Sequence, residues 1–324
     1  MHLEMLRNLL IGFVLLLVIL GISFTYLAIK YFPKDLWLVL RGLHKKYLCY
    51  TFLFLFLFHT FDTLRVIVIA RALNIRYPLW YGYLVSFINT FGATVTPAHL
   101  GGEFLPLYTL TRRGGQFYQI LTIITIKGFS GFFFYLFFLP LTLKTLLSDP
   151  RQTKEFLGVV GSILILSALS FGIYKFLIRK ERGFKKEWLI KIKMTLFRYI
   201  ITCKNFFKTK KRAFVLALAF SMIMYFSYLL EGVFLVKAFN PSAEARKIFL
   251  DQLPLLYAIF ISPTPGGSGV GEFGALPIFF PYIAEDYLGV FVILWRVISQ
   301  YFSAFIGGLF FLGFLYKDLR KNAS

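Results

Sequence analysis

The stretch YLCYTFLFLFLFHTFDTLRVIVIARA (47–72) is almost continuously apolar. It is longer than the roughly 20 residues that a helix needs to cross a lipid bilayer. The whole chain shares this character, since 58% of its 324 residues are hydrophobic and only 16% are charged. Such a composition excludes a water-soluble globular domain and a disordered chain, and two cysteines exclude a disulfide scaffold. The sequence therefore predicts an all-α polytopic membrane protein.

Six apolar stretches are long enough to cross a membrane, and the first lacks the cleavage site of a signal peptide. These predicted spans are 9–29, 47–72, 116–147, 156–177, 213–239 and 287–316. Two further apolar regions, roughly 79–111 and 249–283, are interrupted in the middle by Pro and Gly. Such breaks are tolerated at membrane depth only where protein or a water-filled cavity covers the freed backbone groups. We therefore expect two re-entrant hairpins beside about six transmembrane helices.

Positive charge is concentrated in one segment of the chain. Lys and Arg number 36 against 15 Asp and Glu, a net charge of +21, and 14 of these cations lie in 175–212 beside only two acids. The middle of this segment, EWLIKIKMTLFRYIITCKNFF (187–207), predicts an amphipathic helix on an anionic leaflet, with a solvated loop as the alternative. The positive-inside rule places the segment in the cytoplasm. Nucleic-acid binding is not favoured for a basic run in this context.

The two interrupted regions resemble each other. The first reads TPAHLGGE (96–103) and the second reads TPGGSGVGE (264–272). In each, the final glutamate is followed 24 residues later by a cation within the next apolar span, Lys127 or Arg296. An internal repeat with a Pro/Gly-broken segment in each half is typical of transporters whose site lies between the halves.

The charge distribution favours halves that are inverted relative to each other, with both termini in the cytoplasm. This topology puts 22 Lys and Arg inside and 11 outside. It places residues 30–46, which carry five of the cations, outside the cell as an interfacial helix. In the alternative topology the first interrupted region, 79–111, crosses the membrane completely and the N-terminus lies outside. The predicted units are 1–46 (first helix and interfacial segment), 47–155 (first repeat), 156–212 (linking helix and basic segment) and 213–324 (second repeat).

The same motifs resemble a known family. TPAHLGGEFLPLYTLTRRGG (96–115), PTPGGSGVGEFGA (263–275) and LWRVISQYFSAFIGG (294–308) are similar to signatures of the lysylphosphatidylglycerol synthetase transmembrane, or flippase-like, family. The resemblance implies a relative of the flippase half of the multiple peptide resistance factor, which moves aminoacylated phosphatidylglycerol. Other relatives are associated with hopanoids or polyprenyl-linked sugars, so the resemblance does not fix the substrate.

Two positions depart from the family pattern. Lys127 stands where family members usually carry an arginine, and Pro106 stands where they usually carry a second arginine. Lysine lacks the bidentate fork of arginine, so phosphate binding is expected to be weaker in the first half. The residues after Tyr316 are too few for a soluble transferase domain, and we expect a transporter rather than an enzyme.

Ionisable groups at membrane depth are costly and are candidates for function. Lys127 and Arg296 have the chemistry to bind a lipid phosphate. Glu103 and Glu272 could neutralise these cations, bind a headgroup amine or carry a proton, and the alternative is that both pairs are purely structural. The glycines of the second break allow tight turns and expose N–H groups to an anion. They are Gly266, Gly267, Gly269 and Gly271.

A further charged group lies in the second predicted span. His59, Asp62 and Arg65 fall broadly on one helix face, and we expect an Asp62–Arg65 ion pair rather than a substrate site. Arg65 and Glu231 are equivalent at a repeat offset of 166, which predicts that they approach each other or share a cavity. His99 and Glu103 are spaced as metal ligands, but two ligands without a third make a metal site improbable.

These features together favour a flippase-like transporter of an anionic phospholipid or a polyprenyl phosphate in the cytoplasmic membrane. No cofactor is expected. One alternative is a membrane-embedded enzyme acting on lipid-linked substrates. Another is a noncatalytic membrane partner of a separate cytosolic lipid-modifying enzyme. The sequence does not predict the headgroup, the direction, the energy coupling or the oligomeric state.

Overall fold

The computed structural model describes residues 2–148, 153–154, 156–158, 160–162, 165 and 186–323. Every regular element within these residues is helical, which confirms the predicted all-α fold. The α-helices are α1 (His2–Tyr31), α2 (Leu36–Gly42), α3 (Lys45–Ala72), α4 (Leu79–Val95), α5 (Leu100–Thr111), α6 (Phe117–Ser148), α8 (Lys186–Thr209), α9 (Lys211–Phe239), α10 (Ala245–Ile261), α11 (Val270–Phe279), α12 (Glu285–Arg296) and α13 (Phe302–Ala323). Two 3₁₀ turns and one π-helical turn join some of them: η1 (Pro97–His99), η2 (Pro265–Gly267) and η3 (Val297–Tyr301).

Within the described part of the chain, five helical segments are long and apolar enough to cross a membrane. They are Leu10–Tyr31, Lys45–Ala72, Phe117–Ser148, Lys211–Phe239 and Glu285–Asp318. They coincide with five of the six predicted spans, and the last contains α12, η3 and α13 in succession. Most of the one remaining predicted span, 156–177, lies outside the described residues.

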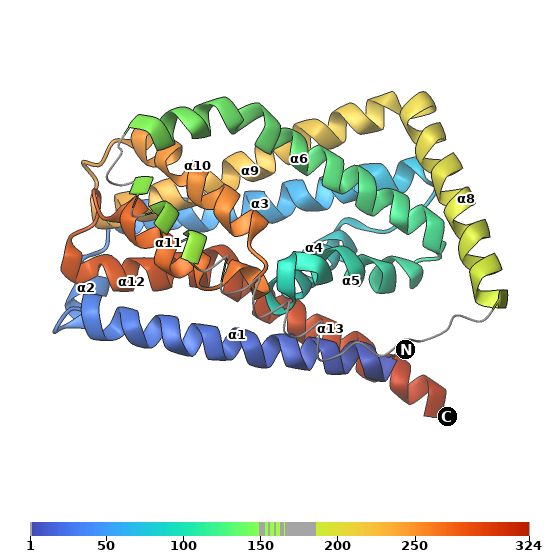
Figure 1. Ribbon diagram of the computed structural model, residues 1–324, viewed down its shortest axis with the longest axis horizontal. Coiled ribbons are helices and arrows are strands. Elements are labelled where there is room, and N and C mark those ends of the chain that lie inside the picture. The colour runs from blue at the N-terminus through green and yellow to red at the C-terminus, as the bar shows by residue number, and fades with distance from the viewer. Residues whose placement is uncertain are drawn as a thin grey trace.

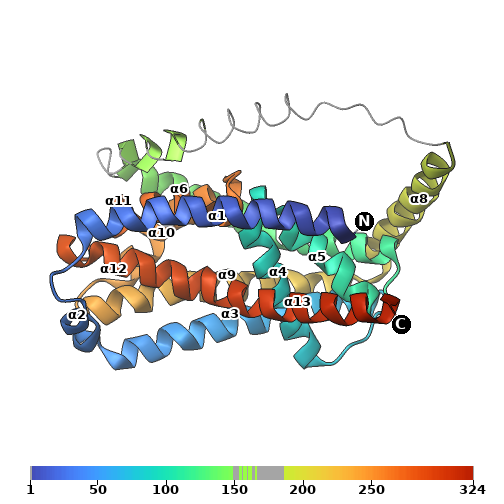
Figure 2. The same cartoon turned by 90° about the horizontal axis from the view of Figure 1, so that it is seen from below.

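Two long antiparallel helices, α3 and α9, pack side by side along the bundle (Figures 1 and 2). Near one end the backbone N–H of His44 donates to the carbonyl of Ala238 at 3.0 Å. Farther along, Nη1 of Arg65 donates to Oγ of Ser221 at 3.3 Å. This antiparallel register determines which charged groups of the two helices can meet.

Two helical elements are broken in the middle, at the motifs that the sequence indicated. We call α4–η1–α5 (79–111) the first broken element and α10–η2–α11 (245–279) the second broken element. Each break begins with an extended threonine before a proline, because proline disfavours a helical conformation in the residue that precedes it. The breaks contact each other, since the N–H of Ala98 donates to the carbonyl of Pro263 at 3.2 Å.

The two broken elements have their bases at opposite ends of the bundle. The first ends beside the C-terminal helix, where Arg112 forms an ion pair with Asp318. The second ends beside the opposite end of α9, where Nδ2 of Asn240 donates to the carbonyl of Tyr282 at 2.9 Å. Both chain termini and α8 lie at the first of these ends, and α2 lies at the other (Figures 1 and 2).

The basic segment is helical over Lys186–Thr209, as predicted for 187–207, and residues 175–185 lie outside the described part of the chain. The stretch 30–46, where an interfacial helix is expected, contains the short helix α2, which Asp35 caps by accepting a hydrogen bond from the N–H of Leu38.

Candidate functional site

Glu272 and Arg296 form a fully buried ion pair behind the second break. Nε of Arg296 donates to Oε1 of Glu272 at 2.8 Å, and neither side chain is exposed. Nη2 of Arg296 donates to the carbonyl of Gly266 at 3.0 Å and to the hydroxyl of Tyr301 at 3.0 Å. Glu272 also accepts bonds from the Tyr301 hydroxyl and from the N–H of Gly269, each at 2.5 Å. We call Glu272–Arg296 the second-break pair.

A π-helical turn brings Tyr301 to this pair. The turn η3 follows Arg296 directly, and π-helical turns are frequent at functional sites. Gly271 also lies against the guanidinium, since any Cβ there would stand 2.7 Å from Cζ of Arg296. The close approach therefore requires glycine at this position, and the pair is held between α11 and η3.

Glu103 and Lys127 form the corresponding pair behind the first break. Nζ of Lys127 donates to Oε1 of Glu103 at 3.1 Å and to the carbonyl of Gly102 at 3.4 Å. The Glu103 side chain is 42% exposed and that of Lys127 is 11% exposed. This first-break pair is thus partly open, with few bonds to its cation, whereas the second-break pair is sealed.

The two breaks share an unusual backbone conformation. Ala98 and His99 have φ values of 52° and 57°, and Gly266 and Gly267 have 60° and 65° at the corresponding places after Thr-Pro. The left-handed region is unstrained for glycine but costs alanine and histidine free energy. The first break therefore adopts the turn of the second without the residues that favour it.

The glycines of the second break make hydrogen bonds within the protein. Gly266 presents its carbonyl, not its N–H, to Arg296. The N–H of Gly267 donates to the carbonyl of Thr264 at 3.2 Å, and that of Gly269 donates to Glu272. In this conformation the N–H groups of Gly267 and Gly269 are used within the protein, so an anion would have to displace these bonds.

Asp62 is the centre of a buried network, and its predicted ion pair with Arg65 is present. Its other carboxylate oxygen accepts a bond from the hydroxyl of Ser86 at 2.6 Å. His59 lies between Ser86 and Ser303, with its ring nitrogens 3.0 Å and 2.7 Å from their hydroxyls. The network joins α3, α4 and α13, which supports a structural role for the Asp62–Arg65 pair.

Arg65 and Glu231 do not meet as the repeat offset suggested. Arg65 contacts Asp62 and Ser221. Glu231 lies ten residues after Ser221 on α9, about 15 Å farther along the helix axis. Because α3 and α9 are antiparallel, residues at equivalent positions of the repeat meet only near the crossing point, and Arg65 and Glu231 lie on opposite sides of it.

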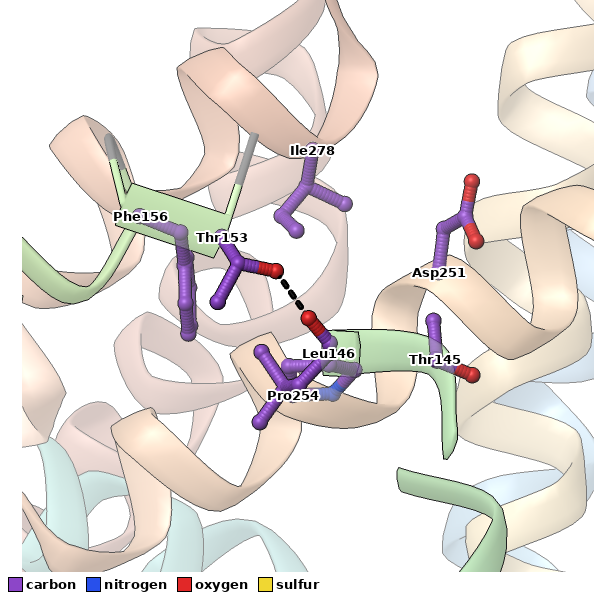
Figure 3. A pocket seen from close by; sticks show the side chains of 7 residues that line it. All are labelled: Thr145, Leu146, Thr153, Phe156, Asp251, Pro254 and Ile278. Carbon is purple, nitrogen blue, oxygen red and sulfur yellow. Dashed lines mark hydrogen bonds between the residues drawn. The ribbon is translucent and has the colours of Figure 1, made fainter. Parts of the chain in front are cut away.

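A pocket with an empty volume of about 250 Å³ lies near the end of α6, away from both ion pairs (Figure 3). It is lined by Thr145, Leu146, Thr153, Phe156, Asp251, Pro254 and Ile278. The hydroxyl of Tyr282 donates to Asp251. Burial is the main cause of a raised pKa of Tyr282, and this hydrogen bond raises the pKa further. None of the predicted site residues is among the described residues that line this pocket.

Two members of the site were not predicted from the sequence. Tyr301 contacts both residues of the second-break pair, and Nε2 of Gln300 donates to Oγ1 of Thr94 at 3.0 Å, which joins η3 to α4. Both belong to the π-helical turn, which no pattern in the sequence predicts. Tyr301 is one of 19 tyrosines, and no pattern distinguishes it from the others.

The comparisons with known proteins agree with this architecture. The family model of the lysylphosphatidylglycerol synthase TM region matches residues 9–307, nearly the whole chain. A UPF0104 membrane protein of Archaeoglobus fulgidus is 22% identical over 309 residues, which are 90% of this chain and 94% of that protein. No solved structure matches the chain. With its multiple apolar helices, the chain is a multi-pass membrane protein that belongs to the lysylphosphatidylglycerol synthase transmembrane-region family.

Proposed function

We propose that this protein is a flippase-like transporter in the cytoplasmic membrane. It moves the headgroup of an anionic phospholipid or a polyprenyl phosphate along a polar path between the two breaks, while the tails stay in the bilayer. One observation carries the proposal: two equivalent acid–base pairs, Glu103–Lys127 and Glu272–Arg296, lie behind two breaks that contact each other. Broken helices of this kind form the substrate sites of many transporters.

In this proposal the broken elements are re-entrant hairpins of an inverted repeat. The first enters from the cytoplasm and the second from outside, and both termini are cytoplasmic. Two observations support this topology: the bases of the elements lie at opposite ends of the bundle, and both termini share one end with the basic helix α8.

The ion pairs keep each cation neutralised until a phosphate arrives, because an uncompensated charge at this depth would be costly. Two polar atoms of the pairs are buried without a hydrogen-bond partner in the described part of the chain, Oε2 of Glu103 and Nη1 of Arg296. One is an acceptor and the other a donor. A headgroup with a phosphate and a hydroxyl or amine can satisfy both.

The test is lipid movement in liposomes that contain the purified protein and fluorescent phosphatidylglycerol. We expect Lys127→Gln and Arg296→Gln to slow the exchange between leaflets at least about tenfold, which corresponds to roughly 1.4 kcal/mol. Lys144→Gln is the matched control, since Lys144 is an exposed cation on α6. Because Arg296 is buried, Glu272→Gln and a folding check by size-exclusion chromatography accompany it.

Unchanged lipid exchange in the variants of both pairs would refute the proposal. Chemical conversion of a lipid-linked substrate by the wild-type protein would favour the membrane-embedded enzyme instead. Wild-type exchange no faster than that of protein-free liposomes, together with binding of a cytosolic lipid-modifying enzyme, would favour the noncatalytic partner.

A further inference from the structure

Glu231 differs from the other buried acids of the protein. It lies on α9, its side chain is buried with the residue 1% exposed, and neither carboxylate oxygen has a hydrogen-bond partner in the described residues. Leaving a buried polar group unpaired is costly, and leaving a buried charge unpaired is far more so. A carboxyl in this position therefore needs an explanation.

The other acids near the breaks are all paired. Asp62 is bound by Arg65, Glu103 by Lys127 and Glu272 by Arg296. The three cations that the sequence places among these acids are thus engaged elsewhere. Glu231 forms no ion pair with any residue that the structure describes.

Glu231 lies beside a junction of three helices. A Cβ on the next residue, Gly232, would stand 2.0 Å from Oε1 of Gln252 on α10 and 3.3 Å from Nε1 of Trp295 on α12. Both of these atoms also lack a hydrogen-bond partner within the described chain. The junction therefore gathers buried polar atoms that have no hydrogen-bond partner among the described residues.

The titratable groups around Glu231 are few. Tyr228, one turn earlier on α9, interacts electrostatically with Glu231 and with both residues of the second-break pair. The helix α3 faces this part of α9 with aromatic rings, since Phe54 stacks on Phe234 and Phe58 contacts Tyr228. Gln252 and Trp295 do not titrate. Among the described residues no cation forms an ion pair with Glu231, and Tyr228 interacts electrostatically with both Glu231 and Arg296.

We infer that Glu231 is a proton-binding site that couples lipid movement to proton transfer across the membrane. The inference rests on the proposed transport function and adds its driving ion. In the conformation described, the carboxyl holds a proton, because an isolated carboxylate cannot be accommodated in this interior.

Loss of the proton changes the balance at the helix junction. The carboxyl releases H⁺ to water on one face and becomes a carboxylate, and it is regenerated by H⁺ taken from water on the other face. No other bond changes. The carboxylate favours a conformation in which water enters between α9 and α12. In that conformation the guanidinium of Arg296, whose Nη1 has no partner among the described residues in the sealed state, turns away from Glu272. Proton release and opening of the lipid site then occur together.

Two measurements on protein in liposomes test the inference. Infrared spectroscopy at neutral pH reports the carbonyl band of a protonated carboxylic acid, and we expect Glu231→Gln to remove it. The second measurement uses a pH gradient at clamped membrane potential with fluorescent phosphatidylglycerol. One proton per lipid shifts the leaflet ratio by up to about tenfold per pH unit. Glu231→Gln is expected to abolish this shift, whereas Glu285→Gln, an exposed acid on α12, retains the band and the shift.

Each result decides the inference. An infrared spectrum that is the same for wild type and Glu231→Gln would show an ionised Glu231 and overturn it. A leaflet ratio that still follows the pH gradient in Glu231→Gln would overturn the coupling. Failure of the proposed transport is distinguishable, because the wild type would then move no lipid with or without a gradient, and this would overturn the coupling while the infrared band still identified the proton site.

Discussion

Replacing Gly271 with alanine tests how tightly the protein holds Arg296. A Cβ at this position would lie 2.7 Å from Cζ and 2.9 Å from Nε and Nη1 of Arg296. These distances are well below the roughly 3.5 Å of an optimal carbon contact. The guanidinium cannot move aside freely, because it is fully buried and donates to Glu272, Gly266 and Tyr301. The substitution must therefore overpack the site or break bonds of the second-break pair.

If the substitution both overpacks the site and breaks one bond, the expected loss of stability is about 1.5–5.5 kcal/mol. Overpacking costs about 1–3 kcal/mol, and a lost hydrogen bond to a charged group costs about 1.5–3 kcal/mol. Alanine recovers only about 0.5–1 kcal/mol in a helix. The assay is denaturant unfolding in detergent micelles, followed by tryptophan fluorescence.

The control for Gly271→Ala is Gly128→Ala on α6. Gly128 is exposed and a Cβ there meets no atom within 4 Å. We expect this control to stabilise the protein by about 0.5–1 kcal/mol, as alanine does in a helix interior. Equal unfolding free energies for the two variants would refute the tight packing of α11 against Arg296.

Three further substitutions have defined effects on the unfolding free energy, measured in the same assay. Asp62→Asn leaves the buried Arg65 uncompensated and is expected to cost about 3–5 kcal/mol. Ala98→Gly removes left-handed strain of about 1–2 kcal/mol, of which about 0.4–1 kcal/mol is lost to the greater freedom of the unfolded chain, so a net stabilisation follows. Tyr301→Phe removes the hydroxyl that contacts both residues of the second-break pair and is expected to cost about 1.5–3 kcal/mol.

The controls make the same chemical changes at exposed or regular positions. They are Asp286→Asn, Ala213→Gly within α9, and Tyr316→Phe. Ala213→Gly is expected to destabilise by about 0.5–1 kcal/mol, the opposite sign to Ala98→Gly. A loss below about 1 kcal/mol for Asp62→Asn, a destabilising Ala98→Gly or a neutral Tyr301→Phe would contradict the corresponding contact.

The spans, the breaks and the charged pairs were predictable from the sequence for physical reasons. A lipid environment forces every spanning segment to satisfy its own backbone, so apolar runs of sufficient length become helices. At each break the residue before a proline is extended, Thr96 before Pro97 and Thr264 before Pro265, because proline disfavours a helical conformation in the residue that precedes it. The spacing of 24 residues then brings each glutamate to a cation on the following helix.

The contacts between helices were not predictable in the same way. The antiparallel register of α3 and α9 keeps Arg65 away from Glu231. This register depends on which side chains pack against each other, and a uniformly apolar composition does not determine that. The π-helical turn adds one residue to a helical loop and so rotates Tyr301 toward Arg296. The regular α-helical period of 3.6 residues predicts neither the register of α3 and α9 nor the π-helical turn.

The difference between the two ion pairs indicates an order of events in the proposed transport cycle. Lys127 gives up one carboxylate and one weak carbonyl contact when it takes a phosphate, and its partner Glu103 is already 42% exposed. Arg296 gives up three partners in a sealed site. A lysine also forms fewer geometrically fixed bonds to phosphate than an arginine does, so it releases its ligand more readily. In the proposed cycle we therefore expect the headgroup to bind first at the first break and to reach Arg296 only when the second-break pair has opened.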